Sequence, residues 1–560
     1  MPSRRAQLLR HYEDLACSAR ILRASSAGFQ PAARSLRALL FCLLILLLTC
    51  SLTACTTIAS GPEKDTLRCN LGSEPPSLDW HTSTDSTSFD VVCNLMVGLT
   101  QYTPDLKVAP CIASSWDVLD GGRRYLFHLR PDVKWSDGKP LTARDFEYAW
   151  KRLLLPDTGA QYAYFIYDVV NARDFNTGKI KDATQLGVKA LDDHTLEVRL
   201  TRPAAYFIYL TAYAPTYPMR KDVVERFGNR WTEAGNMVVD GPFVLKLWQH
   251  EYKIELAANP LYFEGEPRLK HIKLFMVPEQ STAFALYQNN ELDYIDNRSL
   301  ATPDIEQVRQ SPEYHNFALL RAAYIGFNCS KKPFTDARVR RAFSMALDRD
   351  LLVKVARRGQ HPVHTWIPPG LLGYAADDGL PYDPAAARKL LAEAGYPDGA
   401  GFPPLDMLYP NREDVGMVAQ EMQDQWKSNL GVRINLQNME WKMFLETLHR
   451  DPPPIFRSSW GADYPDPETF ANLFITGGGN NDVRYANPQY DRLIDQAEGE
   501  QNETRRGQLY SQADRLLCKT DAALAPTYLD AQNLVIKPWV HGIMQNRLDL
   551  QFFKTVWIGQ

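Results

Sequence analysis

The chain has 560 residues and a formal net charge of −4, with 45% hydrophobic and 23% charged residues. This is ordinary globular composition, and the length suggests about three or four domain-sized units. No basic excess is present, which argues against a nucleic-acid partner because such a partner requires a positively charged face.

The first 54 residues have the pattern of a secretory signal. Seven arginines lie within residues 1–37, and an unbroken apolar run follows from Ala38 to Leu48. That run is too short to cross a bilayer core of roughly 30 Å, so a signal peptide is predicted and not a membrane span. Leu52-Thr53-Ala54-Cys55 resembles the lipobox of bacterial lipoproteins. The resemblance implies cleavage before Cys55 and a lipid on its sulfur, with an ordinary signal cleaved near Ala54 as the alternative.

The remaining chain is expected to be anchored by this lipid and not embedded, because no other apolar run reaches spanning length. Removing residues 1–54, with their seven Arg and two acidic residues, changes the net charge from −4 to −9. Five further cysteines allow at most two disulfides in an oxidising compartment, and without a CxxC spacing a zinc site is not expected. Buried free thiols are the simplest interpretation of these cysteines, which are Cys69, Cys93, Cys111, Cys329 and Cys518.

The first half of the chain has a mixed α and β pattern. Asp120-Gly121-Gly122 is the strongest hairpin signal and joins strands expected at 112–116 and 124–129. Thr142 is expected to cap a helix that buries Phe146, Ala149 and Trp150. Further strands are expected at 67–71, 187–189, 195–200, 238–247, 252–257 and 270–277, and helices at 89–99 and 281–289.

After Asn328 helices alternate with strands, which is typical of an α/β unit. Asp336 is expected to cap a helix whose apolar residues recur at helical spacing, and Asp383-Pro384 to open another. Helices are also predicted at 415–428 and 441–449, with strands around 432–436 and at 528–536. The amphipathic pattern over 488–518 predicts one long helix.

The residues from Arg457 to Pro467 carry the clearest binding chemistry. Two rings, Trp460 and Tyr464, bracket Asp463, and prolines follow that a helix or central strand would not accept. In a closed cleft Asp463 would hold an ammonium group and Arg457 a carboxylate, with the rings over the apolar part between them. This would suit a zwitterionic peptide, although such a segment alone is more often an aromatic-anchored surface loop.

Short motifs with a fixed order extend from about Leu67 to the last strand. They are Phe127-His128-Leu129-Arg130, Trp135-Ser136-Asp137-Gly138, Thr142-Ala143-Arg144-Asp145-Phe146, residues 187–198, residues 333–340, Glu440-Trp441-Lys442 and Trp460-Gly461-Ala462-Asp463-Tyr464. Together they resemble the oligopeptide-binding proteins of bacterial peptide ABC importers, in the class of extracytoplasmic solute-binding proteins that carry peptides, nickel or haem. The resemblance implies a mixed α/β fold, a type II periplasmic-binding-protein clamshell of two lobes with an extra β-rich subdomain on the first.

The implied domain boundaries follow from the same resemblance. Lobe 1 would comprise residues 61–96, 222–320 and 531–560, the inserted subdomain 97–221, and lobe 2 residues 321–530. The chain would cross between the lobes near Arg321 and Ala531.

The resemblance also assigns roles to individual residues. Asp463 matches the aspartate that binds the peptide α-amino group, Tyr162 an aromatic residue that covers the ligand, and Arg457 a partner of the ligand carboxylate. Trp441 and Trp460 would line side-chain pockets. Purely structural roles remain open: Trp441 and Tyr162 as packing residues, and Arg457 in a salt bridge within its own lobe.

The chain departs from the family pattern at the carboxyl end of the ligand. Gly461 replaces a cysteine common in peptide-binding relatives, and Arg321 its disulfide partner, so that bridge is not expected. Val415 and Leu448 replace a histidine and an arginine, and Asp530 a pocket tyrosine. Recognition of the amino end is therefore expected to be retained, and recognition of the carboxyl end to differ.

The predicted function is a monomeric, lipid-anchored carrier that captures peptides and delivers them to an ABC permease and its ATPases. Its predicted location is the periplasmic side of a bacterial envelope membrane or the outer face of the cell membrane. No catalytic residue, metal or cofactor is predicted. A murein peptide, nickel or haem remains the alternative cargo. A secreted peptidase is less favoured because HExxH, GxSxG and P-loop motifs are missing and the residues from His361 to His364 fit a turn.

Overall fold

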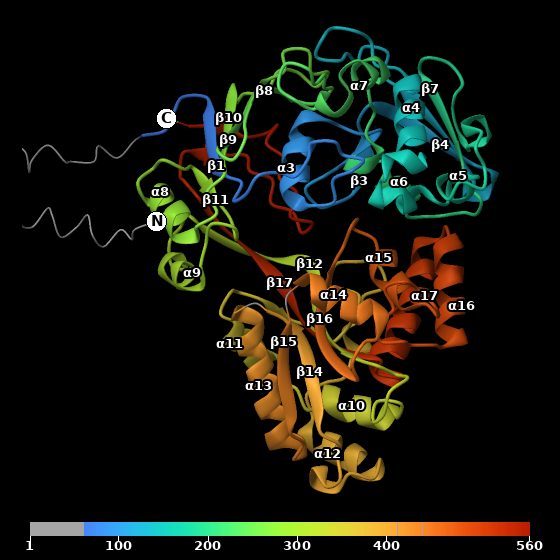
Figure 1. Ribbon diagram of the computed structural model, residues 1–560, viewed down its shortest axis with the longest axis vertical. Coiled ribbons are helices and arrows are strands. Elements are labelled where there is room, and N and C mark those ends of the chain that lie inside the picture. Colours follow the sequence, from blue (N-terminus) through green and yellow to red (C-terminus); the bar gives the residue numbers. More distant parts are fainter. Residues whose placement is uncertain (1–60, 412, 440, 560) are drawn as a thin grey trace, which may run out of the picture. The chain divides into compact units, whose positions relative to one another are not determined.

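Two long antiparallel strands, β12 (Tyr314–Phe327) and β17 (Leu524–Ile536), lie at the centre of one mixed sheet (Figure 1). The computed structural model describes residues 61–411, 413–439 and 441–559, and only the backbone at 413, 414, 441 and 442. The eleven described strands of this sheet follow the order β15-β14-β16-β12-β17-β11-β1-β10-β9-β8, with β13 also paired to β17. Their bounds are β15 (Ile434–Met439), β14 (Leu405–Pro410), β16 (Ile455–Gly461), β11 (Tyr294–Ile295), β1 (Thr66–Asn70), β10 (His271–Phe275), β9 (Lys253–Ala258), β8 (Phe243–Gln249) and β13 (His361–Pro362).

The pairing of β12 with β17 is interrupted near its middle. It runs from Tyr314–Val535 to Ala318–Ala531 and resumes at Ala322–Leu529. Strand β16 pairs with β12 only from Arg321 onward, while β11 pairs with β17 only at Val535 and Ile536. In the described part of the sheet, therefore, the strands on either side of the interruption are connected through β12 and β17. Arg321 and Ala531, the expected crossing points between lobes, both border this interruption.

A second sheet contains four strands in the order β4-β5-β7-β6. The predicted hairpin is confirmed, because β4 (Ala113–Leu119) and β5 (Arg124–Leu129) pair antiparallel around residues 120–122. Strands β6 (Val188–Ala190) and β7 (Thr195–Arg199) complete the sheet, and helix α4 (Ala143–Leu154) packs against it (Figure 1). Thr142 caps α4 as predicted, and Phe146, Ala149 and Trp150 are buried.

The one long helix predicted for residues 488–518 is wrong. The structure has two helices, α16 (Pro488–Gly499) and α17 (Glu503–Arg515), followed by a π-helical turn at Leu516–Thr520. Asn502 separates them because its side-chain oxygen accepts the N–H of Arg505 and thereby starts a new helix. The sequence pattern also missed β12 and placed the end of the first helix at Leu99 instead of Leu95.

The other helices and short strands pack around these sheets. The helices are α3 (Ser86–Leu95), α5 (Ala172–Asn176), α6 (Phe207–Leu210), α7 (Lys221–Phe227), α8 (Gln280–Gln288), α9 (Thr302–Val308), α10 (Ala337–Met345), α11 (Arg349–Ala356), α12 (Pro384–Glu393), α13 (Glu413–Leu430), α14 (Trp441–Arg450) and α15 (Glu468–Ala471). The short strands are β2 (Thr100–Tyr102), β3 (Val108–Pro110), β18 (Val540–His541) and β19 (Trp557–Ile558). Across the described residues, every helix is too short or too polar to span a bilayer.

One aromatic cluster fixes α15 against β12. The ring of Trp366 is buried, and its centroid lies 5.0 Å from that of Tyr324 in β12 and 5.5 Å from that of Phe470 in α15. The indole N–H of Trp366 also donates to the Phe470 carbonyl at 2.8 Å. This packing sets the position of the segment between β16 and α15, which contains Asp463.

The five cysteines of the described region are free thiols, and four of them are fully buried. The expectation of buried free thiols therefore holds for these four, while Cys329 is half-buried. Cys55 lies outside the described residues, as does the whole predicted signal peptide.

Candidate ligand-binding site

Asp463 lies just beyond the end of β16, in a segment that is held at both ends. The N–H of Ala462 donates to the Leu320 carbonyl, and the N–H of Asp463 lies 3.4 Å from the Thr469 hydroxyl. Further on, the buried carboxylate of Asp466 accepts two hydrogen bonds of 2.6 and 2.7 Å from the guanidinium of Arg506 in α17. Because the bidentate pair is buried and geometrically specific, it fixes the backbone that carries Asp463.

The Asp463 side chain is half-buried, and its carboxylate has no counterion in the part of the chain that the structure describes. Burial raises the pKa of Asp463 to about 7, and the Thr469 hydroxyl lowers it slightly. A carboxylate withdrawn from water at such a position is strongly stabilised by a cation that arrives with a ligand.

A cavity of about 560 Å³, here named the anchor cavity, brings three predicted site residues together. Tyr162, Trp460 and Asp463 all line it. The ring of Tyr162 is stacked on Phe89 with centroids 6.1 Å apart, and its hydroxyl donates to the Thr84 carbonyl at 3.3 Å. These contacts hold Tyr162 in place while it still lines the cavity, so its packing and ligand-covering roles are compatible.

Trp460 contributes a polar group without a partner. Its indole Nε1 is buried and makes no hydrogen bond within residues 61–411, 413–439 and 441–559. An unsatisfied buried N–H costs about 1–3 kcal/mol, which a ligand acceptor would recover. Trp460 and Asp463 therefore offer a hydrogen-bond donor and an anion to the same cavity.

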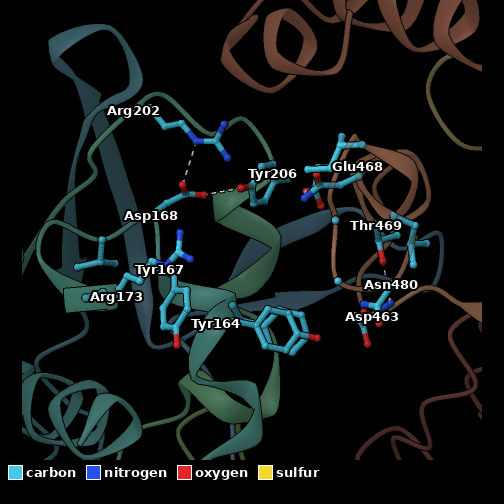
Figure 2. Close-up of a pocket in the computed structure, with 18 of the residues that line it drawn as sticks. Tyr164, Tyr167, Asp168, Arg173, Arg202, Tyr206, Asp463, Glu468, Thr469 and Asn480 are labelled. Carbon is cyan, nitrogen blue, oxygen red and sulfur yellow. Dashed lines mark hydrogen bonds and ion pairs between the residues drawn. The ribbon is translucent and has the colours of Figure 1, made fainter. Parts of the chain in front are cut away.

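Trp460 and Asp463 also border a second cavity of about 720 Å³, the tyrosine cavity, which Figure 2 shows. Its opposite wall includes Tyr164, whose ring lies toward Asp463 in the figure, and Tyr206. Asp168 connects Arg202 and Tyr206 in this wall, because its carboxylate accepts hydrogen bonds from Arg202 at 3.0 Å and from the Tyr206 hydroxyl. The sequence did not indicate this wall, because Tyr164 in the 3-10 helix Gln161–Ile166 and Tyr206 at the start of α6 belong to no motif.

Arg457 does not line either of these cavities. It is 4% exposed, and its Nη2 donates to the Tyr528 hydroxyl at 2.8 Å. In β16 Arg457 pairs with Ile325 of β12 and lies four residues before Gly461, the last residue of the strand. The Tyr528 ring covers the Arg457 guanidinium there. The structure thus places Arg457 away from Asp463 and its cavities.

The remaining predicted positions are distributed around the site. Trp441 begins α14, and its side chain lies outside the described atoms. Leu448 lines the anchor cavity, whereas Val415 is buried in the core beside β14. Arg321 lies directly opposite Gly461 in the β12–β16 register, so the two positions that the resemblance pairs are neighbours.

The anchor cavity also contains acidic residues that the sequence did not indicate. Burial raises the pKa of Asp90 to about 7 and that of Asp549 to about 6. Asp482 accepts a hydrogen bond from the His449 ring at 3.3 Å, and burial raises its pKa as well. With Asp463 these residues line the cavity with acidic groups, of which Asp90 is already paired with Arg298 at 2.7 Å.

The model of "Bacterial extracellular solute-binding proteins, family 5 Middle" matches residues 107–482. The chain belongs to this family. Among relatives of this family 5 protein is the periplasmic oligopeptide-binding protein OppA of Salmonella typhimurium, 35% identical over 521 residues that cover 89% of this chain and 93% of OppA. The probable deoxycholate-binding periplasmic protein YgiS of Escherichia coli is 33% identical, with coverage of 88% and 93%. The periplasmic murein peptide-binding protein MppA of Escherichia coli is 32% identical, with coverage of 92% and 98%.

Solved structures confirm the fold of this family 5 protein. The unliganded open form of the murein tripeptide-binding protein MppA superposes with a TM-score of 0.79 and 31% identity, and covers 89% of this chain and 98% of its own. Haemophilus influenzae OppA in complex with the peptide RPPGFSPFR gives a TM-score of 0.72 and 29% identity, covering 90% and 100%. The predicted mixed α/β periplasmic-binding-protein fold is therefore correct.

Proposed function

We propose that this protein captures peptides by their free α-amino group and delivers them to an ABC permease with its ATPases. The observation that carries the proposal is the Asp463 carboxylate, which lines two cavities, is partly withdrawn from water, and has no counterion among the described residues. The unpartnered indole N–H of Trp460 beside it would serve a peptide acceptor. Relatives whose names specify oligopeptide and murein peptide binding support the same ligand class.

Peptide capture at this position relies on backbone and terminal groups. The α-ammonium group of a peptide would compensate the Asp463 carboxylate for its lost hydration. The side chains of the ligand would occupy the larger spaces of the two cavities. Waters in such spaces adapt to different side chains, which suits a carrier of many sequences. The charge pair then supplies the fixed point of the ligand.

The interrupted pairing of β12 with β17 supports motion of one lobe against the other. We assign residues 61–96, 222–320 and 531–560 to lobe 1, 97–221 to the inserted subdomain and 321–530 to lobe 2. A ligand that contacts both lobes favours their closed arrangement, and the permease would recognise this arrangement. Tyr162 from the inserted subdomain and Asp463 from lobe 2 line one cavity, as this assignment requires.

The alternatives differ in the charge of their ligand. Deoxycholate, named for one relative, has a carboxylate and no ammonium group, so Asp463 would repel it. Nickel or haem would require metal ligands, and no cluster of three or more His, Cys, Asp or Glu suited to a metal occurs in the described chain. A murein peptide remains within the proposed class, because it also is a peptide. Membership of a solute-binding family supports a carrier over a peptidase.

The proposed location is the periplasmic or outer face of a bacterial membrane. The lipobox-like Leu52-Thr53-Ala54-Cys55 supports a lipid anchor on Cys55 of a monomeric protein. Mass spectrometry of the membrane-extracted protein tests this directly: a diacylated Cys55 as the first residue is expected, and an unmodified N-terminus would contradict the anchor.

Calorimetry of peptide binding to Asp463→Asn tests the function itself. Loss of one partner from a buried charge pair costs about 3–5 kcal/mol, so affinity for a free-amino peptide should fall at least a hundredfold at roughly 1.4 kcal/mol per tenfold. Asp482→Asn is the matched control, because it removes a carboxylate from the same cavity that already has His449 as partner. We expect a less than tenfold change in this control. Unchanged affinity in Asp463→Asn would overturn the assignment.

A further inference from the structure

Arg321 occupies an unusual place in the sheet. Residues 319–321 lie in the interruption between β12 and β17, where the Leu320 N–H donates to the Arg547 carbonyl instead of a neighbouring strand. Arg321 is therefore at the open end of the β12–β16 pair, and its side chain is exposed. It lines the anchor cavity and also a third cavity of about 740 Å³, here named the arginine cavity because Arg357 and Arg358 line it too.

Gly461 provides the space for this side chain. A Cβ atom at Gly461 would lie 3.3 Å from Nε of Arg321, which is tighter than ordinary packing. The stem of Arg321 thus lies over the backbone of Gly461, only two residues before Asp463. Gly461 and Arg321 are directly paired on adjacent strands, and the missing side chain of Gly461 leaves room for the long side chain of Arg321.

The guanidinium of Arg321 forms no ion pair within the described residues, in contrast to three other arginines of this region. Arg506 is bound to Asp466, Arg202 to Asp168 and Glu498, and Arg357 to Glu306. Asp549 is an acidic residue whose pKa the positive charge of Arg321 lowers. Burial has the larger effect, so the pKa of Asp549 is still raised, to about 6. Arg321 is consequently available to a carboxylate that arrives with a ligand.

The charges of the two cavities change sign across Arg321. The anchor cavity is lined by four acidic residues, Asp90, Asp463, Asp482 and Asp549, of which Asp90 is already paired with Arg298 at 2.7 Å. The arginine cavity contains three arginines against Glu306 and Asp530, and Arg321 belongs to both. A peptide with its amino group on Asp463 would find a positive region on the Arg321 side, which matches the charge order of a zwitterion.

We propose that Arg321 binds the terminal carboxylate of the peptide, in place of Arg457. The inference rests on the proposed function and deepens it, because it makes a free carboxyl end part of what the site recognises. Arg321 and Arg457 lie on the same face of the sheet, opposite Gly461 and Ile325 respectively in the β12–β16 register. The guanidinium of Arg457 is hydrogen-bonded to the Tyr528 hydroxyl, whereas Arg321, at the end of the paired strands, lines the anchor and arginine cavities. A planar guanidinium can donate two parallel hydrogen bonds to a carboxylate, which gives both strength and orientation.

The test compares di-, tri- and tetra-alanine with their C-terminal amides by calorimetry. In the unchanged protein we expect at least one free acid of the series to bind ten or more times as tightly as its amide. Arg321→Gln should lower affinity for that acid to the level of the amide and leave the amide unchanged. Arg321→Lys, which keeps the charge and loses the planar fork, should retain part of the preference.

Each outcome decides between the two proposals. A preference for the acid that survives in Arg321→Gln overturns the role of Arg321, as does the lack of any preference in the unchanged protein. If either result is found but N-acetylation of the same peptides still abolishes binding, the proposed capture of the α-amino group holds without the role of Arg321. If none of the free peptides binds the unchanged protein, both proposals fail for this ligand class.

Discussion

Arg202 and Glu498 form an ion pair although 296 residues separate them in the sequence. Arg202 follows β7, whereas Glu498 lies in the last turn of α16, and the carbonyl of Glu498 also accepts the N–H of Ala205. Asp168 completes the group through a second bond to Arg202 at 3.0 Å. This contact joins the stretch that we assign to the inserted subdomain to lobe 2, at the edge of the tyrosine cavity.

Arg202→Ala should destabilise the protein more at pH 8 than at pH 6. Burial raises the pKa of Glu498 to about 7, so its contribution to the free energy of unfolding is greatest at low pH and is lost as the pH rises through 7. Without Arg202 the two acidic residues Glu498 and Asp168 remain together without their cation, and the loss grows as Glu498 ionises. Because Arg202 is 43% exposed, we expect about 1–3 kcal/mol at pH 8, below the cost of breaking a fully buried pair.

Urea unfolding at both pH values measures this effect. The double variant Arg202→Ala/Glu498→Gln provides the control, since an uncharged amide removes the repulsion and should recover much of the loss at pH 8. Equal losses at pH 6 and pH 8 in Arg202→Ala would show that the pair acts through packing alone.

Peptide affinity should have a maximum near neutral pH. Asp463 with a pKa of about 7 must be ionised to hold an ammonium group, and binding therefore weakens as the pH falls. The α-amino group of a peptide, with a pKa of roughly 7.7–8.0, must be protonated, so binding also weakens at high pH. From these two values we expect affinity to drop more than tenfold between pH 7.4 and pH 5.5.

The control for this profile is Asp463→Asn, in which the residual binding should lose its acid limb. This comparison is needed because burial also raises the pKa of other acids in the anchor cavity, to about 7 for Asp90 and about 6 for Asp549, and raises that of Asp482. An acid limb that persists unchanged in Asp463→Asn would assign the titration to one of these neighbours.

Local signals in the sequence predicted much of the fold, but not its long-range contacts. The cap at Thr142 and the hairpin at residues 120–122 depend on neighbours in the chain, and the structure has both. The break at Asn502 was missed because the apolar pattern continues across it, and β12 because its partners β16 and β17 both lie more than 100 residues further along the chain. The spacing of apolar residues predicts which face of a helix or strand a side chain lies on, but not which other element packs against that face.

The same limit explains the outcome at the site. The resemblance selected Tyr162, Trp460 and Asp463, which the fold places around one cavity. It also selected Arg457, and nothing in residues 457–467 indicates that Tyr528 covers this guanidinium. Asp549 and Arg506 escaped notice because each meets the Asp463 region only through tertiary packing.

A disulfide introduced at positions 321 and 461 should form and stabilise the protein. Leu320 and Ala462 are joined by a hydrogen bond, so the adjacent Arg321–Gly461 pair belongs to the closer, non-hydrogen-bonded type with Cα atoms about 4.5 Å apart, within disulfide range. The crosslink closes a long loop, for which stabilisation of about 2–4 kcal/mol is typical. Thiol titration of native Arg321→Cys/Gly461→Cys should detect no new reactive thiols, and reduction should lower its melting temperature.

The single variant Gly461→Cys is the control for this disulfide, because it adds a thiol without a partner. Cys93 and Cys518 should not compete, since both are buried and burial raises the pKa of each thiol. Two reactive thiols in the native double variant would contradict the β12–β16 register.

Gly326→Ala should destabilise the sheet from within. A Cβ atom at Gly326 in β12 would lie 2.3 Å from the ring of Phe456, which is fully buried in β16. Overpacking of this kind typically costs about 1–3 kcal/mol. Gly416→Ala is the matched control, because Gly416 lies in α13 and its added Cβ would meet only the Tyr409 ring at 3.8 Å. Since alanine favours helix over glycine, this control should gain about 0.5–1 kcal/mol. Urea unfolding of both variants measures the contrast, and equal stability of Gly326→Ala and the unchanged protein would mean that Phe456 has room to move away from β12.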